Sequence, residues 1–182
     1  MKKALIFLAE GFEEMEAVTP LDLLRRAGID AKFVSLAGTL AVTGSHGITY
    51  QADMLFDQSV AEEADMLILP GGMPGSQYLQ DNEALGKLLL KFHTEGKFVC
   101  AICAAPMVLG QLGILRGKKA TIYPGMEDRL TGATPVAEKI CRDGNIITGR
   151  GPDAAVPFAL TLIGALAGQE TADKIKGDIV FD

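Results

Sequence analysis

Short apolar runs alternate along this chain with segments whose apolar residues recur at helical spacing. Residues 3–9 and 65–69 are nearly continuous apolar runs, typical of strands that are covered on both faces. Residues 82–95 instead carry apolar side chains at the i, i+3, i+4, i+7 spacing of one buried helix face: Leu85, Leu88, Leu89 and Phe92. Repeated β-α-β units of this kind predict an α/β fold, a mostly parallel sheet with helices on both faces.

The rest of the chain continues this alternation. Pro20 and Gly28 are expected to bound the first helix, at 20–27, with the proline in its first turn. The other expected elements are strands at 31–36, 97–102, 120–122, 136–141 and 145–148, a hairpin at 40–52, and helices at 104–112, 126–130, 153–167 and the C-terminus. The 182 residues, 48% of them hydrophobic, fit a single domain over 1–182.

Charge and the N-terminal residues restrict the classes of partner. The formal net charge is −6, and apart from Lys2-Lys3 at the N-terminus the paired basic residues are Arg25-Arg26 and Lys118-Lys119, so neither nucleic acid nor a membrane is expected as a partner. The apolar run after Met1 meets acids from Glu10 onward, which makes it too short for a secretory signal or a membrane span. We therefore expect a cytoplasmic protein with reduced thiols.

Two of the three cysteines have the spacing of a redox pair, Cys100-Ala-Ile-Cys103. If Cys100 lies in a strand and Cys103 at its end, their Cα atoms are about 10 Å apart, beyond the reach of a disulfide. Metal ligation is also not expected, because Cys141 and two scattered histidines offer no second half-site. We interpret Cys100 and Cys141 as structural residues.

Cys103 lies where a predicted strand turns directly into a predicted helix, and the small residues Ala104 and Ala105 follow it. This arrangement is typical of a nucleophile elbow, in which the side chain stands above the edge of the sheet. The helix amides beyond it are expected to lower the pKa of the thiol. A buried structural cysteine remains the alternative.

Four motifs, in this order, resemble those of the ThiJ/PfpI superfamily: "AEGFEEMEAVTPLDLLRRAGI", "LILPGG", "AICAAP" and "TGRGPDAAVPFAL". The DJ-one branch and its bacterial relatives are the most similar, over residues 3 to 180. The resemblance implies a flavodoxin-like sandwich that forms homodimers and uses no cofactor or metal. It also implies that Cys103 is the reactive cysteine, Glu16 its partner carboxyl, and Gly72 and Ala104 the backbone donors to a substrate oxygen.

Elementary electrostatics makes this implied set coherent. A thiolate beside a carboxylate would be repelled, so we expect a raised pKa and a protonated state for Glu16. Gly72 allows a backbone amide to approach a substrate without interference from a Cβ atom. Alternatively, Glu16 belongs to a solvated acidic face, and Gly71-Gly72 forms only a tight turn.

Three further residues have side chains that could serve a site. Tyr123 stands where the family has a histidine, and it is a poor general base near neutral pH. His46 falls on the hairpin loop, and we hypothesise that it approaches Cys103 of the partner subunit; otherwise it is an ordinary loop residue. His93 is expected to face solvent at the end of a helix.

The resemblance leaves three functions open. The first is a cofactor-independent, cysteine-dependent glyoxalase or deglycase that acts on methylglyoxal-type dicarbonyls and their protein adducts. The second is a redox sensor or chaperone-like stress protein in which Cys103 oxidises to a sulfinic acid. The third, a cysteine peptidase or amidotransferase, normally requires a histidine near the nucleophile, and Ala104 follows Cys103 here.

Overall fold

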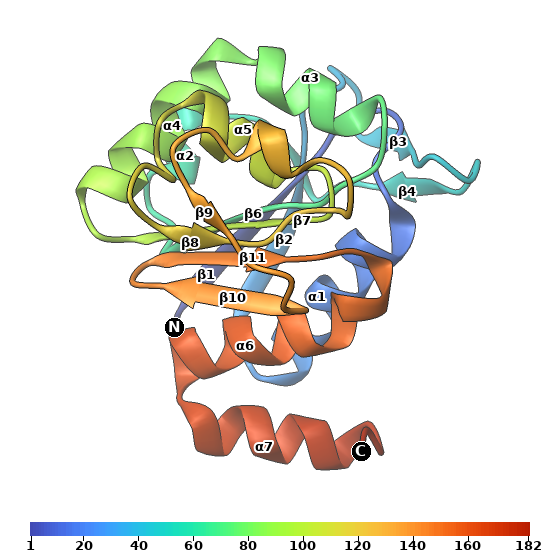
Figure 1. Ribbon diagram of the computed structural model, residues 1–182. Coiled ribbons are helices and arrows are strands. Elements are labelled where there is room, and N and C mark those ends of the chain that lie inside the picture. The colour runs from blue at the N-terminus through green and yellow to red at the C-terminus, as the bar shows by residue number, and fades with distance from the viewer.

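The computed structural model describes residues 1–182 and has a seven-stranded sheet at its centre (Figure 1). The strand order is β10-β11-β7-β6-β1-β2-β5, and every neighbouring pair is parallel except β10 and β11. The strands are β1 (Lys3–Leu8), β2 (Asp30–Ser35), β5 (Met54–Leu55), β6 (Met66–Leu69), β7 (Phe98–Ile102), β10 (Ile140–Asp143) and β11 (Ile146–Gly149). This is the predicted flavodoxin-like arrangement.

Helices cover both faces of this sheet (Figure 1). On one face lie α1 (Glu14–Arg26) and α6 (Ala155–Ala167), with α7 (Gln169–Asp178) packed outside α6. On the other lie α2 (Gln58–Ala61), α3 (Gly75–Asp81), α4 (Glu83–Thr94) and α5 (Pro106–Gln111).

The apolar run of β1 serves both layers, as its unbroken hydrophobicity predicts. Alternate residues of a strand point to opposite faces. Ile6 and Leu8 accordingly join the core cluster that includes residues of α1 and α6, whereas Leu5 and Phe7 join the cluster that includes residues of α4 and α5. The two clusters contain 26 and 25 buried residues, so the sheet separates two cores of similar size.

Three expected elements differ from the structure. The first helix begins at Glu14 rather than at residue 20, and Pro20 lies inside it; the burial of Glu16 and Ala17 extends the helix toward its N-terminus. The expected strand at 120–122 is β8 (Lys119–Ala120), which pairs with β9 (Thr134–Pro135) outside the main sheet. The expected strand at 136–141 begins only at Ile140.

The remaining boundaries are close to those expected. The hairpin at 40–52 is confirmed as β3 (Ala41–Thr43) and β4 (Thr49–Gln51), an antiparallel pair outside the main sheet. The four periodic residues of α4 are all buried, and the side chain of Asn82 caps that helix. Two 3₁₀ turns, η1 (Glu127–Arg129) and η2 (Pro152–Ala154), complete the chain, while α2 and α3 were not expected.

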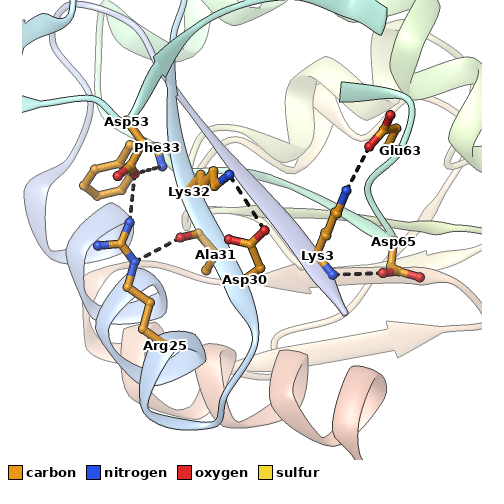
Figure 2. Close-up of polar contacts among 9 residues, drawn as sticks. All are labelled: Lys3, Arg25, Asp30, Ala31, Lys32, Phe33, Asp53, Glu63 and Asp65. Atoms are coloured by element: carbon orange, nitrogen blue, oxygen red, sulfur yellow. Dashed lines mark hydrogen bonds and ion pairs between the residues drawn. The ribbon is translucent and has the colours of Figure 1, made fainter. Parts of the chain in front are cut away.

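Polar contacts join neighbouring elements (Figure 2). Near the amino ends of β1 and β6, the Lys3 amide donates a hydrogen bond of 2.9 Å to the carboxylate of Asp65. The carboxylate of Asp53 accepts from the Phe33 amide at 2.7 Å and from the Arg25 guanidinium at 2.8 Å, which ties α1, β2 and the start of β5 together. None of the helices is both long and apolar enough to cross a membrane. The carboxyl ends of the parallel strands, where α/β proteins usually bind ligands, lie at the opposite end of the sheet from these contacts.

Candidate active site

Cys103 forms the predicted elbow at the carboxyl end of β7. Its backbone has a φ of +64°, a left-handed conformation that is uncommon for a residue with a side chain. The conformation is held from both sides, because the Cys103 amide donates to the carbonyl of Gly149 and the Tyr123 amide donates to the carbonyl of Cys103, each at 2.9 Å. The residue is 9% exposed, so a small part of it can be reached from outside.

Glu16, in the first turn of α1, is completely buried and is the acid nearest to Cys103 in the site. Its Oε2 accepts a hydrogen bond of 2.9 Å from the Gly71 amide. Its Oε1 has no hydrogen-bond partner of good geometry. The neighbouring side chain that can form a hydrogen bond with the Glu16 carboxyl is that of Cys103. The carboxyl group therefore faces the thiol with one oxygen still free.

Gly71 fits between these two side chains because it lacks a Cβ atom. A Cβ added there would lie 2.5 Å from Oε2 of Glu16 and 2.6 Å from Cβ of Cys103. Neither neighbour is solvent-facing, so neither has room to withdraw. The spacing of the pair therefore depends on this glycine.

The two ionisable groups influence each other. Burial raises the pKa of Glu16 to about 7, which agrees with the predicted direction. Burial and the negative charge of Glu16 raise the pKa of the Cys103 thiol. The prediction that backbone amides leave this thiol with a lowered pKa is wrong, because burial, the largest cause, and the carboxylate of Glu16 outweigh the amides. Protonation of Glu16 removes its charge, so the thiol ionises more readily when Glu16 holds its proton.

The Gly72 and Ala104 amides both lie against the Cys103 sulfur, and both lower the pKa of the thiol. Gly72 has a φ of +88°, and an added Cβ would collide with the backbone of residues 11–13. The structure thus brings together four of the residues singled out in the sequence: the thiol, the carboxyl group and two amides that can donate to an oxygen on the sulfur or on an attached carbon.

Tyr123 and His46 occupy different positions from these four. Tyr123 contacts the elbow through its backbone, while its exposed ring lies 3.5 Å from where a Cβ of Gly151 would stand. His46 lies on the β3–β4 loop and turns to Glu14, with its amide at 2.8 Å and its Nδ1 at 2.9 Å from that carboxylate. Within one chain His46 does not reach Cys103, so its approach to a partner subunit stays a prediction.

Glu14 is a buried acid that sequence reasoning did not single out. Its carboxylate accepts hydrogen bonds from the His46 amide and the Ser45 hydroxyl, and the imidazole of His46 lowers its pKa. These contacts fasten the hairpin loop to the start of α1, two residues before Glu16. Glu13, Glu14 and His46 bring ligand atoms within 4.8 Å of one another, but the loop contacts already use the Glu14 oxygens.

The other cysteines and His93 are structural. All three cysteines are free, and Cys100 is fully buried within β7, as its interpretation as a core residue predicts. The prediction for His93 is wrong. The residue is half-buried, its Nδ1 has no hydrogen-bond partner, and burial together with Lys118 lowers the pKa of the imidazole.

A parallel α/β sandwich with a cysteine elbow facing a buried carboxyl defines a recognisable class of proteins. The chain belongs to the DJ-1/PfpI family, whose model matches residues 2–165. It is similar to the solved structure of oxidized DJ-1 from Toxoplasma gondii, with a TM-score of 0.94 and 37% identity over 100% of this chain and 99% of the other.

Two curated relatives show the range of the family. Protein DJ-1 homolog B of Arabidopsis thaliana is 40% identical over 99% of this chain, but the match covers only 42% of that longer protein. A protein of Pyrococcus horikoshii that is named a deglycase is 36% identical over 82% of this chain and 90% of its own length. At least one relative of this chain is therefore named for a deglycase activity.

Proposed function

We propose that this protein is a cofactor-independent glyoxalase or deglycase that acts on methylglyoxal-type dicarbonyls and their protein adducts. The observation that carries the proposal is the buried pair of Cys103 and Glu16, in which the thiol and the carboxyl face each other beside two backbone donors. A general base works best when its pKa is close to the working pH, and the pKa of about 7 for Glu16 meets that condition. The deglycase name of the Pyrococcus relative supports the same reaction class.

The mechanism begins with addition of the Cys103 sulfur to the aldehyde carbon of methylglyoxal. An S–C bond forms, the π electrons move to the oxygen, and that oxygen takes up a proton while the Gly72 and Ala104 amides donate to it. Glu16 then removes the proton on the former aldehyde carbon and returns a proton to the neighbouring carbon, while the hydroxyl proton of the first carbon moves to the oxygen of the second. Water hydrolyses the resulting thioester, which releases lactate and restores the thiol.

The decisive experiment measures D-lactate formed from methylglyoxal by the wild type, Cys103→Ser and Tyr123→His. We expect weak activity in the wild type, none in Cys103→Ser, and more in Tyr123→His, because an imidazole titrates near neutral pH and a phenol does not. A wild type without activity, accompanied by an active Tyr123→His variant, would mean that turnover has lapsed. Cys103→Ser that keeps full activity would refute the mechanism.

A redox sensor is the second candidate, and the free Oε1 of Glu16 favours it. A protonated Glu16 could donate to a sulfinate oxygen on Cys103 from that position. Peroxide should then add two oxygens to Cys103 in wild type and less of this product should accumulate in Glu16→Ala, as read by intact-protein mass spectrometry. Homodimer formation, a cytoplasmic location and a stress-protective role belong to both proposals.

A further inference from the structure

Two hollows lie beside the Cys103 elbow, and Arg150 lines both. The outer hollow, of about 340 Å³, is formed by Tyr123, Pro124 and the segment 150–153. The inner hollow, of about 260 Å³, lies between Pro124, Arg150 and apolar side chains that include Ile122, Leu130 and Val136. They share Pro124 and Arg150, so the guanidinium stands at the junction of two spaces.

Both hollows are attached to the backbone partners of Cys103. Tyr123 donates its amide to the Cys103 carbonyl, and Gly149, which accepts the Cys103 amide, directly precedes Arg150. Arg150 is anchored through its own amide, which donates 2.9 Å to the carbonyl of Lys139. The guanidinium is therefore carried by a segment that is fixed next to the elbow.

Arg150 shares its acidic partner with a second cation. Arg150 Nη2 and Lys139 Nζ approach the same oxygen of Asp153, at 3.1 Å and 3.0 Å. One carboxylate thus meets two cations, and it is the only acid among the residues that line the outer hollow. The inner hollow contains a further acid, Glu127, whose oxygens accept from the Gly125 amide, so an anion meets less repulsion in the outer hollow.

The segment that carries Glu16 is acidic. Glu10, Glu13, Glu14 and Glu16 lie on the loop and first turn that lead into α1. An anionic group on a molecule bound at Cys103 is repelled from that segment and attracted to Arg150. Guanidinium also matches the planar geometry of a carboxylate, with two parallel N–H donors.

We propose that Arg150 is the anion-recognition residue of this site, and that the site prefers small carbonyl compounds that carry a carboxylate beside the reacting carbon. This inference rests on the proposed function for the identity of the reacting carbon. The carboxylate lies in the outer hollow against Arg150, and a short aliphatic chain fits the apolar inner hollow. The addition step is unchanged: the S–C bond forms, the carbonyl oxygen gains a proton, and the carboxylate takes no part.

A matched pair of alkylating reagents tests this without requiring turnover. Iodoacetate and iodoacetamide both transfer a two-carbon group to a thiolate with loss of iodide, but only iodoacetate is anionic. The quantity measured is the ratio of the two rates at Cys103, followed on the Cys103 peptide by mass spectrometry. Because the same thiolate reacts in both cases, the pKa of the thiol cancels in the ratio.

We expect Arg150→Gln to lower the iodoacetate-to-iodoacetamide ratio about fivefold, the effect of one elementary charge several ångströms away in a partly solvated site. Asp153→Asn should raise the ratio, since it frees both cations, and this variant tests the inference even if Arg150→Gln fails to fold. Arg142→Gln is the matched control, because Arg142 lies on β10 at the far end of the β10–β11 hairpin. Its ratio should equal that of the wild type.

An unchanged ratio in both Arg150→Gln and Asp153→Asn would overturn the inference, as would an equal loss in Arg142→Gln, which would mean that only net charge matters. The methylglyoxal assay separates this from the proposed function. A wild type without turnover whose ratio still responds to Arg150 refutes the proposed function and keeps the anion site. Turnover with an unresponsive ratio refutes the anion site alone.

Discussion

Replacing Glu16 by Gln should change how the stability of the protein depends on pH. The folded-state pKa of Glu16, about 7, lies above the 4.5 of an unperturbed glutamate side chain. Between these two values the native protein holds a proton that the unfolded chain has lost, so the stability of the wild type falls as pH rises. Because each tenfold change in proton affinity is worth about 1.4 kcal/mol, the difference between these two pKa values corresponds to about 3 kcal/mol above about pH 8.

The variant keeps the shape of the side chain and an oxygen for the Gly71 amide, but it cannot ionise. Urea unfolding of wild type and Glu16→Gln should therefore give a stability difference that is small near pH 4 and grows to about 3 kcal/mol in favour of the variant near pH 8. Turnover of methylglyoxal should be lost in the same variant, since Gln cannot transfer the proton. The variant would be the more stable protein and the less active one.

Glu138→Gln serves as the control, because Glu138 is an exposed acid on the β9–β10 connection. Its unfolding curves should follow those of the wild type at every pH. Parallel pH dependences for Glu16→Gln and wild type would refute the reasoning, because they would mean that Glu16 titrates alike in the folded and unfolded chains.

Two further changes test the packing of the site and of the core. Gly71→Ala should destabilise the protein by about 1–3 kcal/mol and lower kcat, because the added methyl group meets the Cys103 side chain. Thermal unfolding measures the first effect and lactate formation the second. Gly177→Ala is the control and should be nearly neutral, because nothing lies within 4 Å of the added Cβ. Leu88→Ala, in the buried face of α4, should cost about 2–5 kcal/mol in urea unfolding, whereas Leu90→Ala, at an exposed position, should cost well under half of that.

The elements that could be predicted from local sequence are those whose burial follows a simple period. The four apolar positions of α4 and the unbroken apolar run of β1 were placed correctly, since each pattern matches one kind of surface. The start of α1 was not, because its first turn buries two acids, Glu14 and Glu16. A hydrophobic pattern cannot reveal an acidic residue that is buried because it contacts residues distant in the sequence.

The site was predictable to the same degree. The elbow at Cys103 followed from a strand that ends in small residues, whereas Glu16 and Gly72 came from the family resemblance. The spacing role of Gly71 and the contact of Arg150 with both hollows depend on chain segments that meet only in three dimensions. No feature of the local sequence distinguishes Gly71 from an ordinary turn glycine.

The hydrogen bond from the Gly71 amide to Glu16 has a consequence for refolding. It joins residues that are 55 positions apart, and it can form only after α1 and the end of β6 have docked on the same edge of the sheet. Contacts between residues so distant in sequence require loop closure and form slowly compared with helices. Reactivity of the Cys103 pair should therefore return after most helical structure has formed, which makes the chemistry of this site a reporter of the last stages of assembly.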